Sequence, residues 1–325
     1  MTAAVILVRG DVDRMEWLRV RQIHALYSGL GLLVDLVMVG ADQSAGLLGP
    51  ADRRFRRFAS LRHSAWDSGG RGLAEFLDVL NSRERYLIAH FQGLSTPEGR
   101  VPADFVVAEP AVLDRSLNAD LYIAEVEEKR TALAARSVVA LRMPFDPGAD
   151  RSAVQGQAIG WIGDWPELRV DQVQETLVRL SRHGVYLSTG IVLMGPGADC
   201  VSVPDNLQQW TTVDQRQGHF SVLGLAIAPG PLATREYRII AQLIASNRPV
   251  LLSRDGAEWF EDRWSLPIVN TADDLLKSVE TWIGRRDAFS AALRKTRMSY
   301  FRDLMDMTRY VSREIKSGLK AAKVV

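Results

Sequence analysis

The 325-residue sequence contains one cysteine, Cys200. A single cysteine excludes an internal disulfide, and with it the class of small secreted domains that disulfides hold together. Such low cysteine usage is typical of a reducing compartment. We expect a cytoplasmic protein.

Long hydrophobic runs are absent as well. A membrane-spanning helix needs about 18 or more apolar residues in a row, and the best candidate, residues 25–40, is interrupted by Asp35 and three glycines. The apolar residues at the N-terminus follow no basic segment, so they predict a first strand rather than a signal peptide. The sequence therefore predicts no transmembrane helix.

Charge of one sign is not in excess, because 40 basic and 39 acidic residues give a net charge of +1. No global field favours nucleic acid, so we expect no nucleic-acid partner. Basic residues gather locally in Arg53–Arg57 and in residues 309–323, where helical spacing predicts a basic amphipathic helix. Each stretch is compatible with a solvated or packed surface, or with peripheral contact at the inner face of a membrane.

Several signature motifs are missing. No G-x-G-x-x-G follows the first predicted strand, and the proline between Gly195 and Gly197 favours a turn there rather than a dinucleotide site. Walker, zinc-finger, G-x-S-x-G and H-E-x-x-H motifs are absent too. Asp11 and Asp13 form a D-x-D pair in the first turn, where Asp13 is better suited to cap a helix than to bind a metal. We expect neither a cofactor nor a bound metal.

The sequence does contain apolar runs of four to eight residues that alternate with stretches of helical period. This alternation is typical of βαβ units and a parallel sheet. It is interrupted by a Pro-, Gly- and Asp-rich segment near residues 144–157 and then restarts. We predict the α/β class, with two Rossmann-like domains, 1–146 and 157–285, joined by a hinge. Residues 286–325 are predicted to form C-terminal helices that pack back or lie on a membrane surface.

Two polar residues are predicted at the carboxyl ends of parallel strands, where α/β folds bind ligands. His90 closes the apolar run Tyr-Leu-Ile-Ala-His, and Glu109 closes Phe-Val-Val-Ala-Glu. Together with Asp11, they are candidates for activating an acceptor hydroxyl by general base catalysis. A hydrogen-bonded structural histidine and a surface carboxylate remain the alternatives.

Residues 220–253 carry the sharpest pattern, a strand, a turn, a helix and a second strand. Two prolines flank Gly230 and force the chain to turn, and Thr234 is a good N-cap for the helix. The free amides of that helix start, together with Arg235 and Arg238, make a candidate anion site.

This segment resembles the donor-binding unit of retaining GT-B glycosyltransferases, in which a helix of the type K-x-x-E-A-M-A-x-G-x-P-V-V follows a glycine-containing loop. Residues 241–251, Ala-Gln-Leu-Ile-Ala-Ser-Asn-Arg-Pro-Val-Leu, follow that pattern. Segments 86–90, 119–146, 158–165 and 267–282 also resemble strands and helices of that family. The resemblance implies two Rossmann-like domains that face each other across a cleft.

The donor segment departs from the family at its acids. The family's ribose-binding carboxylate falls on Gln242, and its partner acid, eight residues earlier, falls on Thr234. Glu236 is a candidate substitute. Gly163-Asp164-Trp165 stands where the family has a basic residue. Either the donor is bound differently here or catalysis has been lost.

The function implied by the resemblance is transfer of a sugar from a nucleotide-sugar donor to a polysaccharide or lipid-linked acceptor. In that scheme Thr234, Arg235 and Arg238 neutralise the diphosphate without a metal, and Gln242 meets the ribose. The alternatives are a non-catalytic GT-B-like subunit that binds a partner enzyme, and a nucleotide-dependent oxidoreductase or epimerase.

Overall fold

The computed structural model divides into two compact units. Unit 1 comprises Met1–Pro144 and Asp303–Val325, and unit 2 comprises Phe145–Arg302. The residues that the structure describes are 2–10, 12, 14–40, 54–62, 71–82, 84–94, 101–110, 119–125, 138–144, 158–163, 170–182, 189–195, 197–198, 201–213, 222–230, 234–257, 266–285 and 287–322. Apart from Pro144, the predicted hinge lies outside them.

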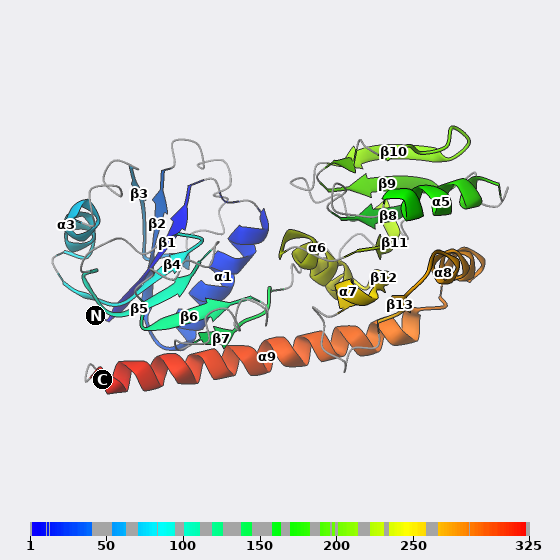
Figure 1. Ribbon diagram of the computed structural model, residues 1–325. Helices are drawn as coiled ribbons and strands as arrows, with labels where there is room; N and C mark the ends of the chain where they lie inside the picture. The colour runs from blue at the N-terminus through cyan, green and yellow to red at the C-terminus, as the bar shows by residue number, and fades with distance from the viewer. Residues whose placement is uncertain are drawn as a thin grey trace. The chain divides into compact units, whose positions relative to one another are not determined.

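Unit 1 contains a seven-stranded parallel sheet in the order β3-β2-β1-β4-β5-β6-β7 (Figure 1). The chain runs outward from β1 through β2 to β3, then crosses to the other side of β1 and continues from β4 to β7. The order therefore reverses between β1 and β4. The strands are β1 Ala3–Arg9, β2 Leu33–Val39, β3 Arg57–Leu61, β4 Tyr86–Gln92, β5 Ala103–Glu109, β6 Leu121–Ala124 and β7 Val138–Ala140.

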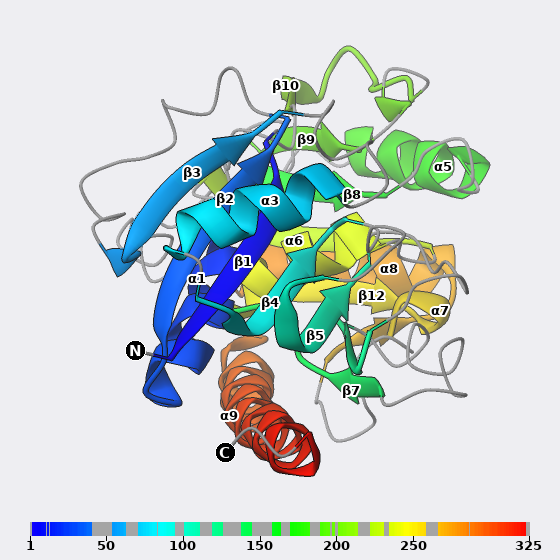
Figure 2. The ribbon, with the colours of Figure 1, turned by 90° about the vertical axis from the view of Figure 1, so that its left-hand side faces the viewer.

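Helices cover both faces of this sheet. Helix α1 (Arg14–Gly29) lies on one face and α3 (Arg71–Leu80) on the other (Figure 2). Alternate residues of a strand point to opposite faces, so Ile6 of β1 packs with α1 and Leu7 packs with α3. Strands buried on both sides explain the near-continuous apolar runs in the sequence.

The C-terminal part of helix α9 (Ser290–Ala321), from Asp303 onward, belongs to unit 1 and completes its α1 face. Its residues Val311, Ile315 and Leu319 are buried in the same core cluster as α1. Gly318 permits the close approach, because a Cβ atom there would lie 2.4 Å from the Phe105 ring of β5. The apolar face of the basic amphipathic helix is therefore used inside the protein.

Unit 2 repeats the plan with a six-stranded parallel sheet in the order β10-β9-β8-β11-β12-β13. Here the order reverses between β8 and β11. Strand β10, which has one neighbour, was not expected from the sequence. The strands are β8 Ala158–Ile162, β9 Gly190–Met194, β10 Gln208–Val213, β11 Leu223–Ala228, β12 Val250–Ser253 and β13 Ile268–Val269.

Helices α5 (Val170–Ser181) and α8 (Ala272–Gly284) share one apolar core with the unit 2 sheet. Helix α8 begins after Thr271, whose hydroxyl accepts a hydrogen bond from the Asp274 amide at 3.1 Å, a standard N-cap. Helix α6 (Thr234–Ala245) contacts β12, and the short α7 (Arg254–Ala257) follows β12 directly. The predicted α/β class with two parallel sheets is confirmed.

Within the described part of the chain, no helix is both long and apolar enough to cross a bilayer.

Candidate functional site

In doubly wound sheets, ligands bind outside the carboxyl ends of the strands where the strand order reverses. In unit 2 that point lies between β8 and β11. Gly163 follows β8, and its amide donates to the Met194 carbonyl of β9 at 3.1 Å. Gly230 follows β11 within two residues. Two glycines at this edge leave room for a ligand to approach the backbone closely.

A serine fixes the loop after β11. Ser253, the last residue of β12, donates its hydroxyl hydrogen to the Gly230 carbonyl at 2.9 Å. The same oxygen accepts from the Gly256 amide at 3.1 Å. Gly230, two residues after β11, is therefore tied to the end of the neighbouring strand β12. The sequence analysis placed Gly230 at the site but did not identify Ser253, because a lone serine at a strand end carries no pattern.

Helix α6 starts at Thr234, so the predicted order of strand, helix and second strand is confirmed, while residues 231–233 of the predicted turn lie outside the described residues. The side chains of Thr234 and Arg235 lie outside the described residues. Arg238 is half-buried and makes an interaction within the protein.

The two remaining donor-site candidates of α6 are enclosed. Gln242 is 2% exposed and has an interaction partner, and Glu236 is also 2% exposed. The Oε2 atom of Glu236 is buried without a hydrogen-bond partner among the described residues. A buried carboxylate oxygen is costly unless a donor meets it, so Glu236 Oε2 is suited to accept a hydrogen bond from a hydroxyl or amide.

The other glycine-containing segment of unit 2 forms a turn, as expected. Gly195 and Gly197 have φ values of 124° and 71°, and the Ala198 amide donates to the Gly195 carbonyl at 3.3 Å. Positive φ accounts for the glycines without a nucleotide.

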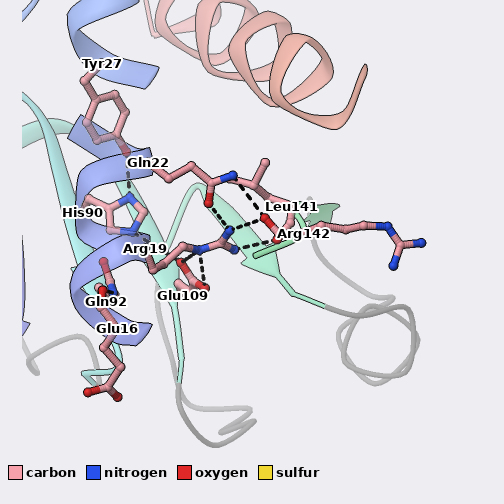
Figure 3. A network of polar contacts seen from close by, with 9 residues as sticks. All are labelled: Glu16, Arg19, Gln22, Tyr27, His90, Gln92, Glu109, Leu141 and Arg142. Carbon is pink, nitrogen blue, oxygen red and sulfur yellow. Dashed lines mark hydrogen bonds and ion pairs between the residues drawn. The ribbon is translucent and has the colours of Figure 1, made fainter. Parts of the chain in front are cut away.

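The corresponding edge of unit 1 holds a buried network of polar side chains between α1 and the sheet (Figure 3). Arg19 of α1 is its centre and is 1% exposed. Its Nε donates to both carboxylate oxygens of Glu109 at 2.9 Å, and its terminal nitrogens donate to the carbonyls of Leu141 and Arg142 at 2.7 and 2.9 Å. One side chain thus joins α1, the end of β5 and the segment after β7.

Glu109 is the last residue of β5, as the sequence predicted. It is 8% exposed, and its carboxylate is paired with Arg19. A carboxylate held in this way has less freedom to accept a proton from a substrate than a free strand-end acid, so the geometry favours a structural part for Glu109. Its catalytic role stays a prediction.

His90 is placed differently from the prediction. Strand β4 continues for two residues beyond it, to Gln92, and the His90 side chain is fully buried against α1. Its Nδ1 shares a hydrogen bond of 2.8 Å with the Tyr27 hydroxyl, and its Nε2 lies 4.0 Å from Glu109 Oε2. Burial, helped by the charge of Arg19 and opposed by Glu109, lowers the pKa of His90 to about 4. His90 is therefore neutral at neutral pH and has no contact with solvent.

Gln92 takes the strand-end position that His90 was expected to occupy. It pairs in register with Glu109 of β5, and its Nε2 donates to the Glu16 carbonyl of α1 at 3.2 Å. Its Oε1, like His90 Nε2, is buried and lacks a hydrogen-bond partner among the described residues.

The structure describes only some of the other predicted residues. Asp11 and Asp13 lie outside the described residues, so the D-x-D pair stays untested. In the basic run, Phe55 packs on Trp17 and His24, and Arg56 binds the buried Asp35. Arg56 is therefore committed to the fold of unit 1.

Comparison with known proteins supplies the context for this geometry. No protein-family model matches the chain, and no curated protein matches it. Several solved structures do match the chain, over nearly its whole length. A glycosyltransferase from Rickettsia africae ESF-5 has a TM-score of 0.63 at 12% identity and covers 98% of this chain and 99% of its own. Anabaena Alr3699/HepE in complex with UDP and glucose has a TM-score of 0.59 at 10% identity, covering 97% of this chain and 100% of its own.

A third similar structure comes from another class of enzyme. It is a putative UDP-N-acetylglucosamine 2-epimerase from Listeria monocytogenes, with a TM-score of 0.55 at 11% identity over 96% of this chain and 98% of its own. At such identities the likeness concerns the fold alone. It confirms the GT-B-like architecture of two Rossmann-like units over nearly the whole chain.

Proposed function

We propose that this chain is a glycosyltransferase that moves a sugar from a nucleotide-sugar donor to a polysaccharide or lipid-linked acceptor. The observation that carries the proposal is the arrangement after β11. At the point where the sheet of unit 2 reverses its strand order, Ser253 holds Gly230 after β11, and α6 starts four residues later at Thr234. A helix start at such a point presents free amides to an anionic group.

The donor is the better supported half of the proposal. Several GT-B structures share the fold, and one of them, Anabaena HepE, was solved with UDP and glucose. In this chain, the α6 amides and Arg238 would neutralise a diphosphate. No metal ion would then be needed for this purpose. Glu236 Oε2, buried and without a partner among the described residues, would accept a hydrogen bond from a donor hydroxyl.

The position of Gln242 favours a second candidate function. The resemblance places the family's ribose-binding acid there, yet the residue is an uncharged amide and is 2% exposed. A GT-B-like subunit without catalysis, which binds a partner enzyme, is consistent with that loss. The fold shared with an epimerase also keeps a sugar-nucleotide epimerase as a weaker alternative.

Calorimetry with UDP, GDP, ADP and NAD separates these functions. The glycosyltransferase proposal expects one nucleoside diphosphate to bind and Arg238→Ala to weaken that binding by roughly 10- to 150-fold, because a charge-assisted hydrogen bond is typically worth about 1.5–3 kcal/mol. Binding should persist in EDTA.

The matched control is Arg285→Ala, which removes an exposed cation of unit 2. Because Arg238 is half-buried, urea unfolding of each variant must accompany the titrations. Equal binding by wild type and Arg238→Ala would refute the assignment of Arg238. A wild type that binds none of the four nucleotides would favour the non-catalytic subunit, and a preference for NAD would favour an oxidoreductase.

A further inference from the structure

Helix α9 has a second face that the fold does not use. Seen along the helix, successive residues turn by about 100°, so Met298, Met305, Arg309, Lys316 and Lys320 fall within an arc of about 60°. All five are exposed. The buried residues Val311, Ile315 and Leu319 lie on a neighbouring side of the helix, centred about 110° away from this arc. Helix α9 is thus amphipathic in an uncommon way, with an apolar face toward the core and a mixed face toward solvent.

The outward face is strongly basic. Helix α9 contains eight basic and three acidic residues, whereas the whole chain has a net charge of +1. One of the three acids, Asp303, is buried beside Arg142, so it does not offset the outward charge. Asp306 is exposed and lies 3.6 Å from Arg309. The surplus of positive charge is therefore displayed along one side of one helix.

Large hydrophobic side chains stand among these cations. Met298, Met305 and Tyr310 are 66%, 55% and 51% exposed, and they are three of the seven large hydrophobic residues that are exposed in the described part of the chain. Single exposed hydrophobic residues need no explanation, but three on the basic side of one helix form a pattern. Cations interleaved with methionine and tyrosine suit the boundary between lipid headgroups and acyl chains.

We propose that the outward face of α9 docks on an anionic membrane surface. The helix is about 48 Å long, since each residue adds about 1.5 Å, so it can lie in the plane of the interface. Arginine and lysine then meet lipid phosphates while the two methionines enter the headgroup region. The apolar residues Val311, Ile315 and Leu319 take no part in this contact, because they are buried inside unit 1.

Nucleic acid, another anionic partner, fits the face less well. A nucleic acid would satisfy the cations through its phosphates but would leave the exposed methionine side chains in water. The second basic stretch of the sequence is also a weaker candidate for membrane contact, because Arg56 is held by Asp35 and Phe55 is packed against α1.

Vesicle flotation with the full chain tests the proposal. Vesicles of phosphatidylcholine with 30% phosphatidylglycerol, a composition on the order of the anionic content assumed for charged bilayers, are compared with phosphatidylcholine alone. We expect binding to the anionic vesicles only, and weaker binding at high salt. The triple variant Arg309→Gln, Arg313→Gln and Lys316→Gln should bind roughly 100-fold more weakly, since each cation near such a surface contributes about a fivefold factor.

A matched control removes three exposed cations elsewhere, with Arg254→Gln, Lys277→Gln and Arg285→Gln, and should bind like wild type. A second variant, Met298→Ser with Met305→Ser, keeps every charge and should lose about threefold or more in vesicle binding. Circular dichroism confirms that each variant is folded. The proposal is overturned if wild type does not bind anionic vesicles, or if the control variant loses as much vesicle binding as the α9 triple variant. The proposal is also overturned if the methionine variant binds vesicles as well as wild type and duplex DNA displaces the protein from them. That result would identify a nucleic-acid surface.

Discussion

Units 1 and 2 share a topology but differ in what they bury. Unit 1 buries six charged side chains among its described residues. These are Arg19, Asp35, Glu109, Glu125, Arg142 and Asp303. In the described part of unit 2, Glu236 is the only buried charged residue, and the ion pairs seen there join exposed side chains such as Arg179 and Asp273.

The difference shows two ways of holding the carboxyl edge of a parallel sheet. In unit 1, α1 is fixed to the strand ends by an ion pair and by hydrogen bonds from Arg19 to backbone carbonyls. In unit 2, the edge is fixed by a turn and a serine hydroxyl. Ionic networks in a protein interior must be complete to be tolerated. The first edge should therefore be fragile toward substitution, and the second should remain open to ligands.

The largest effect should come from Arg19→Ala in unit 1. It leaves the Glu109 carboxylate buried without its cation and removes donors from two carbonyls. Breaking one side of a buried ion pair typically costs about 3–5 kcal/mol of unfolding free energy. Urea unfolding measures the loss. Adding Glu109→Gln to that variant should recover part of it.

The counterpart in unit 2 is Arg179→Ala, which removes a cation bonded to Glu175 and Asp273 at the surface. Exposed pairs contribute little because water and salt screen them. The same urea titration should show a much smaller change. Losses of similar size in both variants would remove the distinction between the two units.

The next effect concerns packing between α9 and the sheet of unit 1. Gly318→Ala normally improves an exposed helix, but here the new methyl group would meet the Phe105 ring at 2.4 and 2.5 Å. Overpacking of this kind costs about 1–3 kcal/mol. Thermal melting should show a lower Tm for the variant.

Gly160→Ala in unit 2 is the matched comparison. Its new Cβ would meet the terminal methyl groups of Leu223 at 2.8 and 2.9 Å, and a leucine end can rotate away more easily than a ring. We expect a smaller drop in Tm. A larger drop for Gly160→Ala would mean that α9 packs less tightly on unit 1 than the Phe105 contact indicates.

The same contrast explains what the sequence could predict. Apolar runs revealed most strands of both units, because buried parallel strands are apolar on both faces. Strand β10, Gln-Gln-Trp-Thr-Thr-Val, was not predicted, because a strand at the edge of the described sheet does not need a continuous apolar run. The order of strand, helix and strand around Gly230 could also be predicted, since the prolines that break a strand and the residues that cap a helix are local signals.

The buried polar network around Arg19 could not be predicted from the sequence. Arg19 stands in a helix among polar and apolar residues and has no local signal of burial, since its partners Glu109 and Leu141 are 90 and 122 residues away. His90 was placed at a strand end because the apolar run stops near it. The strand continues because Gln92 pairs in register with Glu109, and such pairing depends on tertiary structure.

The third prediction uses pH to test the interior of unit 1. The pKa of His90 is lowered to about 4 in the folded protein, from about 6.5 when unfolded. Its neutral form is therefore favoured by folding, so the stability it contributes is present above pH 6.5 and is lost as pH falls toward 4. Between pH 7.5 and pH 5 the loss is about 2 kcal/mol.

His90→Gln isolates this contribution, because glutamine can still bond the Tyr27 hydroxyl but does not titrate. Urea unfolding at the two pH values should show about 2 kcal/mol less pH dependence in the variant than in wild type. Carboxylates other than Glu109, whose charge acts on His90, titrate alike in both proteins and cancel in the difference. Identical pH dependence would mean that His90 is solvated rather than enclosed against α1.

The smallest effect should come from Ser253→Ala in unit 2, and it bears directly on the candidate donor edge. The substitution removes a hydrogen bond to the Gly230 carbonyl and one from the Gly256 amide. Gly230 and Gly256 are buried but Ser253 is half-buried, so water can reach the vacated position only in part, and the cost in unfolding free energy should be about 1 kcal/mol. Ser246→Ala is the matched control, because the Ser246 hydroxyl is buried without a hydrogen-bond partner in the described part of unit 2 and its loss should be neutral.

The two serine variants should differ in their affinity for a nucleoside diphosphate. If the turn after β11 positions the α6 amides for a diphosphate, loosening it should weaken nucleoside-diphosphate binding by several-fold, since an ordered loop that becomes mobile must be fixed again on binding. Calorimetry on both variants decides the matter: weaker binding for Ser253→Ala alone supports a ligand edge held by the backbone, whereas unchanged binding for both would place the anion elsewhere in unit 2.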